Sequence, residues 1–138
     1  MAIFFNTEDI KEVSIERNKI KAWLKSAIEH EKHRLGDLSF IFCSDEYLLK
    51  INKQYLNHDY YTDIITFDYV ENNKVSGDLF ISIDRVVENA ETFKVDFNLE
   101  LRRMMIHGVL HLLGYKDKLD DEKTLMTEKE NFYLSKFL

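Results

Sequence analysis

Two histidines four residues apart are the side chains of this sequence best suited to chemistry. His107 and His111 lie in an apolar stretch, 99–113, whose hydrophobic residues point in nearly every direction around a helix. Such a helix is buried, and residues four apart share one face of it, with Cβ atoms about 5–6 Å from each other. Two buried imidazoles need polar partners, because an unpaired buried polar group costs about 1–3 kcal/mol. A divalent metal ion bound by both rings meets this need.

The residues after the second histidine strengthen the metal hypothesis. Gly114 can adopt a positive φ, end the helix and turn the chain back, and Asp117 follows close enough for its carboxylate to return to the histidines. Two histidines, a glycine turn and a third ligand match the spacing of metzincin-type zinc sites. We therefore predict that Asp117 completes the metal site, with Asp120 or Asp121 as alternative sources of the carboxylate. Zinc is the expected ion, although the same ligand types accept nickel, cobalt, manganese or iron.

The residue directly after His107 argues against a conventional metallopeptidase. Peptidases with this helix place a glutamate there as general base, whereas this chain has Gly108. A peptidase would need a glutamate from elsewhere, such as Glu100, which lies two helical turns away. A bound metal can still polarise a substrate and lower the pKa of a bound water molecule towards about 7, so hydrolysis does not require that glutamate.

The apolar periodicity and the turn residues predict an α+β fold with a mixed sheet of about four strands and five or six helices, one of them the zincin-like metal-binding helix. Strands are expected at 2–5, 38–43, 64–70 and 77–83, the last two as an antiparallel hairpin. Helices are expected from Ser14 to near Gly36, from Ser44 or Asp45 to Tyr55, from Asp84 to Phe93, from Asp96 or Asn98 to Gly114, and from Asp120 or Asp121 to the C-terminus. The absence of proline, repeats and linker-like segments predicts one domain over residues 1–138.

The composition restricts the classes of function. The chain has 19 basic and 25 acidic residues, a net charge of -6, which excludes tight binding of nucleic acid by bulk electrostatics and leaves only local contacts. The single cysteine, Cys43, cannot form an internal disulfide and lies in an apolar run, so we expect a buried thiol and a reducing compartment. No stretch approaches the roughly 20 apolar residues of a membrane span. We expect a cytoplasmic protein with no membrane partner.

The segments 52–67, 77–82 and 107–117 together resemble the YbeY family of bacterial rRNA maturation factors. His107–Asp117, HGVLHLLGYKD, is similar to the family motif HGxLHLxGYDH. Asn52–Phe67, NKQYLNHDYYTDIITF, is similar to the family block N-x-x-[YF]-R-x-x-D-x-P-T-D-V-L-S-F, and Gly77–Ser82, GDLFIS, to the strand GDIxIS. The resemblance implies a metal-dependent, single-strand-specific endoribonuclease involved in 16S rRNA 3′-end maturation and ribosome quality control. It also implies one zinc ion held by the residues at positions 107, 111 and 117.

This chain departs from the family pattern at three positions. Asp117 replaces a histidine, and an anionic ligand leaves less positive charge on the zinc, so we expect a bound water to be less acidic than in a site of three histidines. Leu56 replaces an arginine that is suited to bind phosphate through two hydrogen bonds. Tyr61 replaces a proline in the same loop. Candidates to compensate for the arginine are His58, Arg85, Arg102, Arg103 and Lys116.

Two functions follow from these observations. In the first, the metal takes part in hydrolysis of single-stranded RNA, with a general base that the sequence does not identify. In the second, the metal is structural, and the domain acts as a non-catalytic ribosome-assembly factor that binds the small ribosomal subunit and its assembly proteins. The net acidity and Leu56 favour the second function. An open metal coordination position favours the first, and a closed four-ligand site favours the second.

Overall fold

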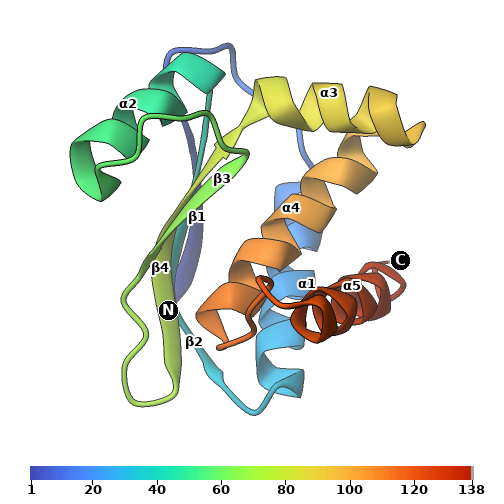
Figure 1. Ribbon diagram of the computed structural model, residues 1–138. Helices are drawn as coiled ribbons and strands as arrows, with labels where there is room; N and C mark the ends of the chain where they lie inside the picture. Colours follow the sequence, from blue (N-terminus) through green and yellow to red (C-terminus); the bar gives the residue numbers. More distant parts are fainter. Residues whose placement is uncertain (138) are drawn as a thin grey trace.

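A four-stranded mixed sheet forms one layer of the protein (Figure 1). The computed structural model describes residues 1–137. The strands are β1 (Ala2–Thr7), β2 (Arg34–Cys43), β3 (Ile64–Asp68) and β4 (Lys74–Ser82), in the spatial order β1-β2-β4-β3. The pairs β1/β2 and β2/β4 are parallel, and β3 pairs with β4 antiparallel. The predicted hairpin and the mixed sheet are therefore confirmed, and β3 lies at an edge of the sheet.

The described residues form five helices, which pack on this sheet or on one another. They are α1 (Arg17–His30), α2 (Asp45–Leu56), α3 (Ile83–Phe93), α4 (Phe97–Leu112) and α5 (Asp120–Leu134). The large core joins α1, α4 and α5 to one face, whereas α2 packs on the other face through a small cluster around Leu48 and Ile65. Figure 1 shows α4 between the sheet and α5. The α+β prediction is confirmed, and none of the described helices is long and apolar enough to cross a membrane.

Helix α4 lies unusually close to the sheet at Gly108. A Cβ at this position would overlap the Leu79 side chain and lie 2.9 Å from Cδ1 of Ile64. The residue after His107 therefore faces the sheet rather than the solvent. A glutamate there, as in the peptidases, would not fit without moving α4 away from β3 and β4.

Helix α1 begins at Arg17 rather than at Ser14, and α5 ends at Leu134. Two further helix boundaries differ from the sequence prediction for local reasons. Helix α1 ends at His30, and the chain turns at Lys32, which has a φ of 64°. Gly36 lies instead in β2, at a shift in the β2/β4 register, where a Cβ would overlap Ser76. This glycine is required by the close approach of two strands and not by a helix end. Helix α3 begins one residue earlier than expected, because the hydroxyl of Ser82 accepts a hydrogen bond from the Arg85 amide.

Candidate metal centre

The structure brings His107, His111 and Asp117 to one point at the end of α4. The two Nε2 atoms lie 3.0 Å apart, and Oδ2 of Asp117 lies 3.3 Å from Nε2 of His107 and 3.2 Å from Nε2 of His111. Four ligands held about 2.0–2.1 Å from a zinc ion at tetrahedral angles lie about 3.3 Å from one another. Three of the four corners of such a tetrahedron are therefore present.

The hydrogen bonds of the rings indicate what the three atoms at this point are. Nδ1 of His111 lies 3.0 Å from the carbonyl oxygen of Tyr115, which only accepts, so this nitrogen carries the hydrogen. Nδ1 of His107 donates to Oε2 of Glu130 at 2.7 Å. In the neutral tautomers both Nε2 atoms then present lone pairs to each other and to the Asp117 carboxylate. Three acceptors facing one point repel each other, and a cation removes that repulsion.

The turn after α4 brings the carboxylate to the histidines. Gly114 has a φ of 104°, in the region that favours glycine, and the Tyr115 amide donates back to the Leu110 carbonyl at 3.0 Å. The chain reverses within three residues, and Asp117 returns to the exposed end of the histidine pair. Asp120 and Asp121 begin α5 instead and are not part of the cluster.

Helix α5 holds His107 through a charged chain of contacts. Glu130 is buried and accepts hydrogen bonds from His107 and, at 3.0 Å, from Arg103, whose second nitrogen donates to Asn131 at 2.8 Å. Burial by itself lowers the pKa of His107, but the hydrogen bond and charge of Glu130, with the charges of Asp117 and Asp63, outweigh it and raise this pKa above the ordinary histidine value. The metal-free protein therefore keeps a proton on His107 up to a higher pH than an ordinary histidine does.

A second set of contacts holds the turn that supports His111. Glu31, at the end of α1, accepts a hydrogen bond from the hydroxyl of Tyr115 at 2.6 Å, pairs with Lys129 at 3.2 Å and also accepts from Tyr133. Lys129 and Tyr133 belong to α5. The carbonyl that orients His111 is therefore anchored to the same helix that orients His107.

The cluster is open to solvent and borders a cavity. The side chains of His107, His111 and Asp117 are 24%, 29% and 36% exposed. Among the described residues these three gather as candidate metal ligands. A tetrahedral zinc site with three protein ligands has one position for water or substrate. A cavity of about 280 Å³ lies beside His107, and its lining comes from the loop before β3 and from α3, α4 and α5: Asp63, Asn89, Phe93, Glu100, Arg103, Met104, His107 and Glu130.

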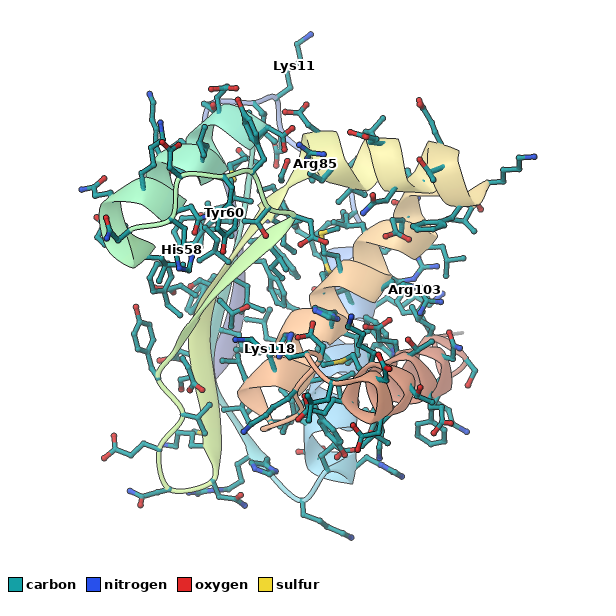
Figure 2. The ribbon with its side chains drawn as sticks, in the orientation of Figure 1. Lys11, His58, Tyr60, Arg85, Arg103 and Lys118 are labelled. Carbon is teal, nitrogen blue, oxygen red and sulfur yellow. The ribbon has the colours of Figure 1, made fainter. Side chains whose placement is uncertain are left out.

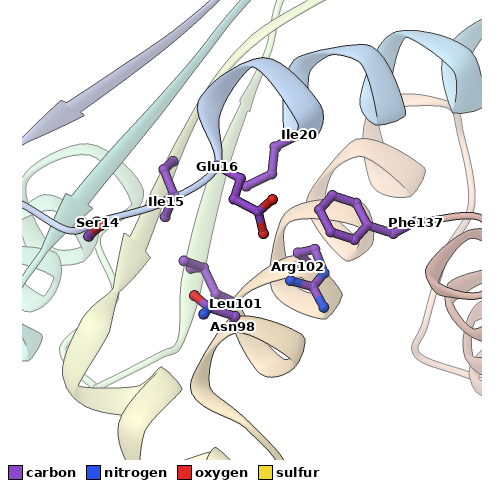
Figure 3. A pocket seen from close by; sticks show the side chains of 8 residues that line it. All are labelled: Ser14, Ile15, Glu16, Ile20, Asn98, Leu101, Arg102 and Phe137. Atoms are coloured by element: carbon purple, nitrogen blue, oxygen red, sulfur yellow. The ribbon is translucent and has the colours of Figure 1, made fainter.

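Each of the three candidate arginines already has a partner in the structure. To replace the family arginine at position 56, it would have to lose that contact. Arg85 pairs with Asp45 at 3.2 Å and Glu88 at 3.5 Å, and Arg103 is bound by α5. The guanidinium of Arg102 stacks on Phe137 in a different cavity of about 190 Å³, between the start of α1 and α4 (Figure 3). Figure 2 shows His58 and Tyr60 on the sheet side of the molecule and Arg103 and Lys118 on the helix side.

Comparison with known proteins identifies the family. The family model described as Endoribonuclease YbeY matches residues 4–138. The chain belongs to the YbeY family. The relative from Parabacteroides distasonis, named Endoribonuclease YbeY, is 55% identical over 131 residues, which cover 95% of this chain and 92% of the relative. The relative of the same name from Flavobacterium psychrophilum is 51% identical over 135 residues, 98% of this chain and 96% of the relative.

A solved structure shows the same fold. The solution structure of TM1509 from Thermotoga maritima matches with a TM-score of 0.70 at 27% identity, over 99% of this chain and 89% of that one. The YbeY resemblance inferred from the sequence motifs is confirmed by the family model and the named relatives. Glu130 and Glu31 were not predictable from the sequence, because neither lies near the candidate ligands along the chain. The one signal for Glu130 in the sequence was a carboxylate at a position of α5 where the helix pattern places a buried residue.

Proposed function

We propose that this protein is a zinc-dependent endoribonuclease that cleaves single-stranded RNA, with His107, His111 and Asp117 as the zinc ligands. The observation that carries the proposal is the solvent-accessible triangle of three lone-pair donors with edges of 3.0–3.3 Å. Such a site has the dimensions of a catalytic zinc centre with one open position. The name of the relatives gives the reaction: hydrolysis of RNA phosphodiester bonds.

The chain's own residues prepare this site for hydrolysis. A bound zinc supplies a Lewis acid and lowers the pKa of a bound water. Glu130 and the Tyr115 carbonyl keep the ring hydrogens on Nδ1 of the two histidines, so that both Nε2 atoms remain free for the metal. The carboxylate of Asp117 neutralises part of the metal charge. The cavity beside His107 provides room for a nucleotide next to the ligands.

The cellular role that we propose is 16S rRNA 3′-end maturation and ribosome quality control in the cytoplasm, on the small ribosomal subunit and its assembly proteins. Membership of the YbeY family supports this role. A protein of net charge -6 does not hold RNA by its overall field. Protein contacts on the ribosomal subunit would bring the RNA to the metal centre without a basic surface.

A non-catalytic binding factor is the second candidate function. It is favoured by Leu56 at the position of the family arginine and by the ion pairs that engage Arg85 and Arg103. In this case the metal would stabilise the turn at Gly114, and the domain would act only by binding the small ribosomal subunit.

Metal analysis of the purified protein beside a His111→Ala variant, followed by incubation of both with single-stranded RNA, separates the two candidates. We expect about one zinc per chain in the parent protein and cleavage that disappears together with the metal in the variant. A parent protein that binds zinc but leaves RNA intact would support the binding factor. A variant that retains full metal content would overturn the assignment of the ligands.

A further inference from the structure

A groove beside the metal centre has the composition of a ligand site. The 280 Å³ cavity next to His107 shares four lining residues with a second cavity of about 460 Å³: Phe93, Glu100, Arg103 and Glu130. The two cavities therefore form one groove that leads from His107 along α4 between α3 and α5. Most of the surface that lines the 460 Å³ part is apolar, and it comes from Phe93, Val95 and Leu99 and from the aliphatic portions of polar residues. A mostly apolar groove with a few polar groups is typical of a small-ligand site.

The floor of the groove contains a buried carboxylate. Glu100 is 6% exposed, on the first turn of α4. Burial raises its pKa, while the charge of Arg103 and a hydrogen bond from Asn89 act in the opposite direction. Burying a carboxylate costs free energy, and an apolar residue of similar size would pack there at lower cost. A polar group kept at the bottom of an open groove is best explained by a ligand that it binds.

The rim of the groove carries an exposed aromatic ring. Phe93, the last residue of α3, is 64% exposed and lines both cavities. An exposed phenylalanine offers a flat surface on which a nucleobase stacks, and single-stranded RNA is bound in this way because its bases are free. Glu100 lies seven residues before His107, about 10 Å along the helix. That distance is comparable to the span of one nucleotide from its phosphate to its base.

We propose that this groove is a nucleobase subsite for guanine, in which Phe93 stacks on the base and the Glu100 carboxylate accepts hydrogen bonds from N1–H and the N2 amino group. The proposal rests on the proposed RNA-cleaving function, since the base belongs to the strand that reaches the metal centre. Guanine alone among the four bases presents two adjacent donors on its Watson–Crick edge. Adenine and cytosine present an acceptor beside one donor, and uracil flanks one donor with two carbonyls, so a carboxylate repels part of each.

The charges of the groove agree with a base and not with a phosphate. Asp63, Glu100 and Glu130 line it, against the single guanidinium of Arg103, which is already paired with Glu130. A phosphate would be repelled by these carboxylates, whereas the donor edge of a base is attracted. The phosphate of the same nucleotide would lie at the metal centre.

Binding of fluorescently labelled 2′-O-methyl oligouridine by the zinc-loaded protein tests the subsite. The strands are uniform uridine or contain one guanosine, inosine or adenosine, and binding is followed by fluorescence anisotropy. We expect the guanosine strand to bind about tenfold more tightly than uniform oligouridine. Inosine, which lacks the N2 amino group, should lose most of this gain. Equal binding of all four strands would overturn the inference.

Two variants test the named residues. The Glu100→Gln side chain offers one acceptor and one donor, which matches adenine. The preference should therefore change from guanosine to adenosine, and an unchanged preference would overturn the role of Glu100.

Phe93→Ala should weaken binding of every strand about tenfold through loss of stacking, whereas Phe93→Tyr should retain the binding. Phe132→Ala is the matched control, because Phe132 is also exposed but lines a different cavity. Since Phe93 is exposed, its variants test the subsite even if Glu100→Gln fails to fold.

The outcomes separate this inference from the proposed function. A protein that binds and cleaves single-stranded RNA without base preference would contradict the guanine subsite and leave the nuclease assignment intact. A zinc-loaded protein that binds none of the strands would contradict both.

Discussion

The two sides of the site differ in how firmly their residues are held. On the helix side, each candidate ligand histidine donates from Nδ1 to a fixed acceptor. His107 donates to Glu130, which belongs to α5, and His111 donates to the Tyr115 carbonyl, whose residue is linked to α5 through Glu31. On the loop side, residues 57–63 are held mostly by contacts at the surface, such as those between Tyr61 and Glu46 at 2.5 Å and between Lys53 and Asp59 at 3.2 Å. This difference indicates that metal binding and RNA contact are separable properties of the chain. The residues proposed to bind the metal are held by the more buried contacts.

Removing the charge of Glu130 is the strongest test of the helix side. Glu130→Gln should lower zinc affinity about 10- to 100-fold, as expected when a carboxylate that orients a ligand histidine is lost. Competition with a chelator measures this affinity directly. Glu128→Gln is the matched control, because Glu128 is an exposed residue of the same helix.

The loop side supplies the counterpart of that test. Glu46→Gln weakens the contact with Tyr61 and should leave zinc affinity unchanged, because no described contact joins Glu46 to the ligands. If Glu46→Gln weakened zinc binding as much as Glu130→Gln, the two sides would not be separable.

Restoring the family arginine sharpens the comparison on the loop side. Leu56 is 40% exposed, so Leu56→Arg places a new cation at the surface without disturbing the core. We expect single-stranded RNA to bind a few-fold more tightly, with the slope of log affinity against log salt steeper by about 0.7, the value for one added phosphate contact. Zinc affinity should stay the same.

Leu125→Arg provides the control for this substitution. Leu125 is 43% exposed and lies on α5. The substitution therefore adds the same charge as Leu56→Arg, at a position of similar exposure but far from the loop along the chain. If both variants steepened the salt dependence equally, the effect would come from net charge rather than from a phosphate contact at position 56.

The parts of the fold that were predictable from the sequence depend on local patterns. Helix periodicity placed His107 and His111 on one stripe, and the glycine at 114 predicted the turn that brings Asp117 back, because both features act within a few residues. The end of α1 was not predictable in this way. Gly36 has the residue type of a helix terminus, but it is required by the contact of β2 with β4, which joins positions about 40 residues apart.

The same limit applies to the site. Glu130 and Glu31 lie 23 residues from His107 and 84 residues from Tyr115, and only the packing of α5 and α1 against α4 brings them together. A single sequence shows that a carboxylate is present at each of these positions. It does not show which aromatic side chain that carboxylate contacts in the folded protein. The three candidate ligand positions followed from spacing, whereas the groups that orient their side chains are known only from the structure.

The stability of the metal-free protein should depend on pH through His107. Its pKa in the folded state is raised above the ordinary value of 6.5 by Glu130 and the nearby aspartates, which outweigh the opposite effect of burial. A raised histidine pKa stabilises the folded state fully below the unfolded value, and this stabilisation is lost as pH rises through the folded value. Thermal melts in the presence of a chelator should therefore show a melting temperature that falls as pH increases from about 6.5 to beyond the folded pKa.

Glu130→Gln identifies the source of this pH dependence. The variant removes the main group that raises the His107 pKa, so its melting temperature should fall less over the same pH range. The tyrosines Tyr115 and Tyr133 do not contribute there, because burial and Glu31 raise their pKa values above 10. Zinc should abolish the dependence in the parent protein, since the metal displaces the proton from the ring. An equal fall in parent and variant would mean that the helix side is not held through the His107–Glu130 pair, and the contrast with the loop side would lose its main support.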